Sequence, residues 1–177
     1  IGGSKVESGK TETLVKALKA KSTLPMVLFP GDVNQITGHA DAILFLSLMS
    51  GDNPEYLIHQ HIKAVPILRE TALEVIPTSY ILIDGGKVSS TEKISQTAPI
   101  PQTEKALICN IAKAAEYSGK QLIYLEAGSG AKYHIDLEII KDVRNTTHLP
   151  LIVGGGIKTD FQKQNIYNAG ADLIVIG

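Results

Sequence analysis

The amino-acid sequence predicts a parallel α/β barrel, and three observations support this fold class. Short apolar segments alternate with stretches of helical periodicity, which is the pattern of successive βαβ units. The apolar segments are nearly continuous, as expected for strands that are buried on both faces. Glycines follow the last three strands, where a barrel places its binding loops. A doubly wound sheet stays open as an alternative, although the usual G-x-G-x-x-G motif is absent.

Composition and charge narrow the class of protein. The chain has 177 residues, of which 44% are apolar and 20% charged, with a net charge of -1. This composition is ordinary for a globular protein, and we expect one barrel domain over residues 1–177. The charge argues against a nucleic-acid surface, which usually needs a basic stripe. The single cysteine, Cys109, excludes a disulfide framework and favours a cytoplasmic location.

The first half of the chain supplies two strands, two helices and an extended segment. Apolar positions 14, 15, 17 and 18 predict an amphipathic helix whose late lysines suit the helix dipole. Prolines bound the first apolar run, and Pro54 marks a helix start. In chain order we expect a helix at 8–21, a strand at 25–30, a loop with a short helical turn at 32–41, a strand at 42–47, a helix at 52–69 and an interrupted extended segment at 74–84.

The second half continues the alternation after a polar interval. Residues 87–101 contain serines, threonine and two prolines, which predicts a mobile surface excursion. Thereafter we expect a helix at 102–118 that Gly119 ends, and then strand 121–125, helix 134–146, strand 149–153, helix 159–169 and strand 171–176. The total is about seven strands. Because the chain opens at what resembles a strand exit and ends just after a strand, we expect barrel elements to be missing at both ends.

Two glycine-rich segments and a final glycine predict a phosphate site. The segment YLEAGSGA at 124–131 follows one strand, GGG at 154–156 follows the next, and Gly177 follows the last. Glycine lets backbone N–H groups approach an anion closely, because no Cβ stands in the way. A single cluster would fit a tight strand-to-helix turn equally well. Two clusters and a final glycine at three successive strand exits favour several N–H groups that converge on one anion.

Glu126 is the candidate general base. A carboxylate at a barrel strand's exit is unfavourable unless it has a partner, so an ion pair with a neighbouring lysine is the alternative. Tyr124 lies two residues earlier and shares the face of Glu126, where its hydroxyl could serve a substrate or merely complete the core. Asp32 and Asp84 also follow strands and are either metal ligands or loop caps.

The order of these motifs resembles a known family. The matching segments are IGGS at 1–4, LFPG at 28–31, FLSL at 45–48, NPEYLI at 53–58, EVIP at 74–77 with Tyr80, YLEAGSGA at 124–131 and VGGGI at 153–157. Together they resemble geranylgeranylglyceryl phosphate synthase over essentially the whole chain. They are also similar to the bacterial heptaprenylglyceryl phosphate synthases. The YLEAGSGA and GGGI motifs together are highly specific.

The resemblance implies a modified (β/α)8 TIM-type barrel that joins a prenyl chain to sn-glycerol-1-phosphate through an ether bond. The expected donor is geranylgeranyl diphosphate, the cofactor is Mg²⁺, and Ser4 would be a metal ligand. A second ligand, an aspartate on a first strand, has no counterpart in this sequence. Glu126 would be catalytic. The substrate-binding residues would be Tyr124, Leu125, Glu126, Ala127, Gly128, Ser129, Gly130, Gly155, Gly156 and Gly177.

The resemblance also implies a homo-oligomer. Because the expected product is a lipid precursor, we expect transient contact with a membrane surface, and the near-neutral charge predicts no nucleic-acid partner. Two other functions stay open from the residues alone. A phosphosugar isomerase or aldolase could use the same phosphate loops, although Lys132 and Lys158 are poorly placed for a Schiff base. The other alternative is a non-catalytic protein that binds a phosphorylated ligand.

Overall fold

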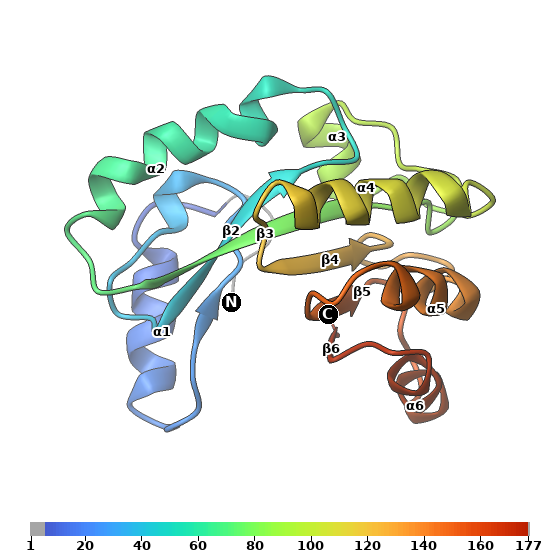
Figure 1. Ribbon diagram of the computed structural model, residues 1–177. Coiled ribbons are helices and arrows are strands. Elements are labelled where there is room, and N and C mark those ends of the chain that lie inside the picture. The colour runs from blue at the N-terminus through green and yellow to red at the C-terminus, as the bar shows by residue number, and fades with distance from the viewer. Residues whose placement is uncertain (1–5, 177) are drawn as a thin grey trace. The chain divides into compact units, whose positions relative to one another are not determined.

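The computed structural model describes residues 6–176 and confirms the alternation of strands and helices (Figure 1). Its sheet has the order β1-β2-β3-β4-β5-β6, so strands that follow one another in sequence are neighbours. This is the order of a TIM-type barrel, whereas a doubly wound sheet reverses its order. Six strands are present in the described residues, against the seven or so expected. No helix in this range combines the length and apolar character needed to cross a membrane.

The elements begin and end close to the expected positions. The helices are α1 (Lys10–Lys19), η1 (Val33–Gln35), η2 (Glu55–His59), α2 (Gln60–Leu68), α3 (Ser90–Ser95), α4 (Lys105–Tyr117), α5 (Leu137–Thr146) and α6 (Asp160–Asn168). The strands are β1 (Val27–Leu28), β2 (Ala42–Leu48), β3 (Glu74–Leu82), β4 (Leu122–Glu126), β5 (Leu151–Gly154) and β6 (Leu173–Val175). β1 pairs with β2, and β3, β4, β5 and β6 pair in succession, in each case parallel.

The described residues form two compact units. The first runs to Phe45 and resumes over Pro54–Ile76, and the second contains Leu46–Asn53 and continues from Pro77. In the first unit, Val15 of α1 is fully buried in a small apolar core. Asp41 accepts a hydrogen bond from the Met26 backbone N–H at 2.6 Å and pairs with Lys19 of α1. These contacts attach α1 to the start of β1.

The second unit has the larger core, formed where α4, α5 and α6 cover one face of β3–β6. Its buried residues include Ile81, Ile83, Ile123, Leu125, Leu151 and Val153 from the strand regions, and Ile108, Ala112, Ile139, Ile140, Val143 and Ile166 from the helices. Figure 1 shows α4 and α5 lying along β4 and β5. Because side chains alternate along a strand, the residues between these core positions face away from the helices. That opposite face carries the candidate site.

Two expectations for residues 74–101 were wrong. The extended segment is one continuous strand, β3, rather than an interrupted one. Pro77 lies one residue before the first pair of β3 with β4, Thr78↔Leu122, and its carbonyl accepts the Gln121 backbone N–H at 2.8 Å. The polar excursion contains α3, which starts at a capping box formed by Ser89 and Glu92. This reciprocal cap satisfies helix N–H groups that an irregular loop would leave to water.

Glu116 links α4 to the turn before β5 and makes stability sensitive to acid. Its carboxylate accepts hydrogen bonds from the Thr147 hydroxyl at 3.0 Å and the His148 backbone N–H at 3.0 Å, and it pairs with Lys113. The Lys113 ammonium, followed by these two hydrogen bonds, lowers the pKa of Glu116 to about 2. A lowered pKa stabilises the fold above the ordinary value near 4.5, and this stabilisation is lost as the pH falls towards 2.

We therefore expect Glu116→Gln to lower the melting temperature at pH 7 by roughly a few degrees. The difference from the unsubstituted protein should shrink as the pH falls from 5 to 3. Differential scanning calorimetry across this pH range measures it. Glu138→Gln is the matched control, because the Glu138–Lys141 pair is more than half exposed on both sides and should contribute little. A constant difference at all pH values would contradict the assignment.

Candidate functional site

The candidate site lies at the carboxyl end of the strands in the second unit. Strand register places Leu82, Glu126 and Gly154 side by side on β3, β4 and β5. Tyr80 and Tyr124 are paired two residues earlier, on the same face. Because residues two apart in a strand share a face, Tyr124 and Glu126 point to the same side of the sheet, as predicted. This face is opposite to the one that α4, α5 and α6 cover.

Glu126 is buried, with 7% of its surface exposed, and has two hydrogen-bond partners. Its Oε1 accepts the Gly128 backbone N–H at 2.6 Å, and the Tyr124 hydroxyl donates to the carboxylate. No ion pair to a basic residue of the described chain accompanies these bonds, which removes the alternative of a lysine partner within that range. Burial raises the pKa of Glu126, and the bonds from Tyr124 and Gly128 oppose the rise. A buried carboxylate with a raised pKa suits a proton acceptor.

Two tyrosine rings stand beside the carboxylate. Tyr80 and Tyr124 pack edge to face, with ring centroids 5.3 Å apart. The Tyr80 hydroxyl lies 3.3 Å from the Thr91 hydroxyl, which attaches α3 to this face. Burial raises the pKa of both tyrosines. Both hydroxyls therefore stay protonated at neutral pH, and Tyr124 holds the orientation of Glu126.

The two glycine segments meet at Glu126. A Cβ placed on Gly154 would lie 2.7 Å from Glu126 Oε2 and 2.5 Å from the Tyr124 hydroxyl oxygen. A Cβ on Gly155 would lie 2.7 Å from the Gly128 backbone nitrogen and 2.8 Å from Glu126 Oε1. The Gly155 contacts include backbone atoms and its φ is +84°, so glycine is required there. At Gly154 a Cβ would force the buried Tyr124 and Glu126 side chains to shift. The two glycine segments therefore lie against one another beside the Glu126 carboxylate.

Four backbone N–H groups are available at these turns. The amides of Ser129, Gly130, Gly155 and Gly156 form no hydrogen bond with other residues in the range 6–176. The amide of Gly128 is already used by Glu126. Successive unpaired N–H groups in turns with positive φ form concave anion sites. The geometry therefore offers a place for a phosphate beside Glu126.

Two further predicted substrate-binding residues, Leu125 on β4 and Ala127 directly after it, contribute to packing and to backbone hydrogen bonding. Leu125 packs in the helix-facing core, and the Ala127 N–H donates to the Gly154 carbonyl at 3.0 Å. Gly177 and Ser4 lie outside the described residues. Lys132 and Lys158 are exposed on the loops after β4 and β5 rather than buried beside Glu126.

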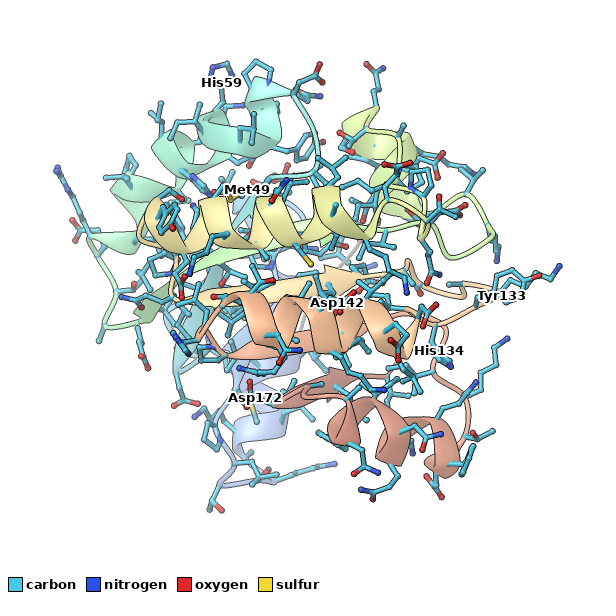
Figure 2. All side chains as sticks on the ribbon, turned by 45° about the vertical axis from the view of Figure 1, so that its right-hand side comes forward. Met49, His59, Tyr133, His134, Asp142 and Asp172 are labelled. Carbon is cyan, nitrogen blue, oxygen red and sulfur yellow. The ribbon has the colours of Figure 1, made fainter. Side chains whose placement is uncertain are left out.

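Sequence reasoning missed Gln102, which braces the loops around the site. Its side-chain amide donates to the Asp84 carbonyl at 2.9 Å and the His134 carbonyl at 3.3 Å, and its Oε1 accepts the Asp136 N–H at 2.7 Å. Figure 2 shows His134 and its neighbour Tyr133 in the segment before α5. The same segment abuts Gly156, whose Cβ would lie 2.7 Å from the His134 nitrogen. No sequence motif signals this brace, because its partners are far apart in the chain.

The described residues do not form a magnesium site by themselves. No group of three His, Cys, Asp or Glu side chains over residues 6–176 could hold a metal ion. Asp84 accepts the Gly86 N–H at 2.8 Å, and Asp32 accepts the Asn34 N–H at 3.0 Å. Both aspartates therefore cap their own loops through a backbone hydrogen bond.

Comparisons with known proteins agree with this geometry. The PcrB family model matches residues 1–177. The geranylgeranylglyceryl phosphate synthase of Zunongwangia profunda is 53% identical over 100% of this chain and 76% of that protein. The protein of the same name from Flavobacterium johnsoniae is 51% identical, over 100% of this chain and 73% of its own length.

Solved structures extend the likeness to the fold. The (S)-3-O-geranylgeranylglyceryl phosphate synthase of Thermoplasma acidophilum, in complex with its substrate sn-glycerol-1-phosphate, has a TM-score of 0.91 at 34% identity and covers 98% of this chain and 69% of that chain. The wild-type GGGPS of Thermoplasma volcanium has a TM-score of 0.92 at 34% identity, with the same coverage. The YdjI aldolase of Escherichia coli K12, at 15% identity and a TM-score of 0.53, covers 94% of this chain and 57% of its own and shares the fold alone.

Proposed function

This chain belongs to the PcrB family, and we propose that it is a prenyltransferase that forms an ether bond between sn-glycerol-1-phosphate and a polyprenyl diphosphate. The proposed donor is geranylgeranyl diphosphate, in line with the name of the relatives that are 53% and 51% identical. One observation carries the proposal: unpaired glycine-turn amides lie beside a buried carboxylate of raised pKa. A relative that is 34% identical binds sn-glycerol-1-phosphate.

In this proposal the glycine turns hold the phosphate. The free N–H groups of Ser129, Gly130, Gly155 and Gly156 donate to its oxygens. Because Glu126 contacts the positions of both Gly154 and Gly155, a glycerol chain anchored at these amides directs its distal hydroxyl towards the carboxylate. Fixing the hydroxyl in this way lowers the entropic barrier of the reaction.

Glu126 then acts on the hydroxyl of glycerol carbon 3. The hydroxyl proton passes to the carboxylate while the oxygen bonds to the first carbon of the prenyl chain. The bond from this carbon to the diphosphate oxygen breaks, and the diphosphate leaves with the electron pair. Tyr124 and the Gly128 N–H keep the carboxylate in place through their hydrogen bonds. The raised pKa makes Glu126 a better proton acceptor than an ordinary exposed glutamate.

The proposed cofactor is Mg²⁺ and its proposed ligand is Ser4, and both rest on the resemblance to the family alone. Bound Mg²⁺ would supply positive charge for the departing diphosphate. That the chain functions as a homo-oligomer and touches a membrane surface transiently stays a prediction.

Product formation tests the proposal. We expect the chain to form a labelled product when it is incubated with Mg²⁺, labelled geranylgeranyl diphosphate and sn-glycerol-1-phosphate. This product should extract into organic solvent and should contain the phosphate of the glycerol. EDTA should abolish the product, and added Mg²⁺ should restore it. Farnesyl and heptaprenyl diphosphates in parallel reactions measure donor length. Binding of glycerol phosphate without turnover of any donor would instead identify a non-catalytic binding protein.

An isomerase or aldolase function is disfavoured by the lysines of the site. A Schiff-base lysine needs a desolvated amine beside the substrate. Lys132 and Lys158 are exposed, and the Lys158 amine is 3.5 Å from the Lys132 carbonyl oxygen. Borohydride trapping with phosphosugars should therefore give no covalent adduct.

A further inference from the structure

We propose that Lys87, Lys132 and Lys158 form a cationic collar around the exposed glycine turn, in which Lys87 contacts the phosphate of the bound substrate. This inference rests on the proposed function for the identity of the phosphate ligand. It adds side chains that neither the motifs nor the resemblance assigned to substrate binding. The collar would draw the phosphorylated alcohol to the four free amides and help to retain it there.

The three lysines lie on segments that touch one another. The Lys87 amine is 3.4 Å from the position of a Cβ on Gly130, directly at the turn with free amides. A Cβ on the preceding residue, Gly86, would lie 3.4 Å from the Lys132 Cβ. The Lys158 amine is 3.5 Å from the Lys132 carbonyl oxygen. The collar is therefore continuous from the exit of β3, through the loop after β4, to the loop after β5.

The collar lysines differ from most other lysines of the chain in having no carboxylate partner among the described residues. Ion pairs occupy Lys10, Lys16, Lys19, Lys63, Lys113, Lys141 and Lys163. Lys87, Lys132 and Lys158 are exposed and have none within residues 6–176. The nearby carboxylates of Asp84 and Asp136 accept backbone N–H groups instead.

The Lys87 amine lies at the Gly130 turn, the Lys132 amine lies over the Tyr133 ring with 5.1 Å to its centroid, and the Lys158 amine lies by the Lys132 carbonyl. These three ammonium groups on adjacent loops, none with a carboxylate partner in the described range, contribute positive potential in a chain whose net charge is -1. Such a potential raises the local concentration of anionic substrates and their rate of association. It acts over about 8 Å at physiological ionic strength, so it falls as salt is added. Lys87 is the collar member that reaches Gly130, and a direct ammonium–phosphate hydrogen bond is stronger than a neutral one.

Lys87→Met tests the direct contact. We expect KM and Kd for sn-glycerol-1-phosphate to rise roughly tenfold, as for loss of one charge-assisted hydrogen bond, with kcat nearly unchanged. Inorganic phosphate should inhibit the variant correspondingly less, and Lys87→Arg should retain most of the affinity. Lys21→Met is the matched control, because Lys21 is also exposed and has no ion pair in the described part of the chain. It makes the same change in net charge and should alter neither constant.

The triple variant Lys87→Met, Lys132→Met and Lys158→Met tests the collar as a whole. The kcat/KM of the unsubstituted protein should fall with increasing NaCl more steeply than that of the triple variant. Melting temperatures without ligand should match, because all three side chains are exposed.

The two proposals fail in different ways. An unchanged Kd for glycerol phosphate in Lys87→Met, with normal ether formation by the unsubstituted protein, overturns the collar and leaves the proposed function intact. If the unsubstituted protein makes no ether product but Lys87→Met still weakens binding tenfold, the collar stands and the prenyltransferase assignment falls. Parallel salt dependences of the triple variant and the unsubstituted protein also count against the collar.

Discussion

Replacing Glu126 with glutamine is expected to lower kcat by about 10²–10⁴-fold, the range for loss of a general base. The amide has nearly the same shape and can still accept the Gly128 N–H, so the two glycine turns should stay in contact. Because the phosphate is held by other groups, KM for sn-glycerol-1-phosphate should change little. Initial rates of labelled product formation and a binding isotherm for glycerol phosphate measure the two effects separately.

The same substitution should stabilise the protein at neutral pH. Burial raises the pKa of Glu126 above its ordinary value of 4.5, so the folded state favours the protonated form. The stabilisation due to protonation is fully present below the unfolded pKa and is lost as the pH rises through the folded one. Glutamine stays neutral throughout. The melting temperature of Glu126→Gln should therefore exceed that of the unsubstituted protein at pH 7, and the two should converge near pH 4.

Together these results would separate a catalytic carboxylate from a structural one. A structural carboxylate would lose stability on substitution and leave turnover largely intact. Glu138→Gln, on the exposed face of α5, controls for the change in net charge and should alter neither quantity. Turnover by Glu126→Gln equal to that of the unsubstituted protein would remove Glu126 from the mechanism.

The parts of the site that could be predicted are those that depend on strand geometry. Alternation along β4 placed Tyr124 and Glu126 on one face, and parallel strands brought the two glycine segments to the same edge. Each of these two placements follows from a short stretch of sequence. Neither requires knowledge of which loop lies beside which.

The parts that could not be predicted depend on tertiary contacts between loops. Gln102 bonds to Asp84 and His134, which are 18 and 32 residues away, and no local pattern encodes that choice. Gly154 lies against Glu126 because of the strand register, and this register is not readable from β5 alone. The capping box of Ser89 and Glu92 has a recognisable spacing, but the polar composition of residues 87–101 favours a mobile surface excursion over a helix.

Gly156→Ala is expected to have the second-largest effect, because the new methyl group would meet backbone atoms rather than a movable side chain. Its Cβ would contact the Tyr133 carbonyl and lie 2.7 Å from the His134 nitrogen, and φ at Gly156 is +70°. The left-handed conformation alone costs roughly 1–2 kcal/mol for alanine. Relief of the clash must also displace either the segment that Gln102 braces or the glycine turn itself, so glycerol phosphate should bind at least tenfold more weakly.

Gly119→Ala separates the two contributions. Gly119 follows α4 with a φ of +79°, and a Cβ there would have nothing within 4 Å. Both variants therefore carry the same backbone strain, and only Gly156→Ala adds a collision. Calorimetry should show a larger fall in melting temperature for Gly156→Ala, and isothermal titration with glycerol phosphate should show a loss of affinity for that variant alone. Equal melting temperatures would mean that the 133–136 segment can move away freely. Equal affinities would mean that the Gly156 turn does not hold the phosphate.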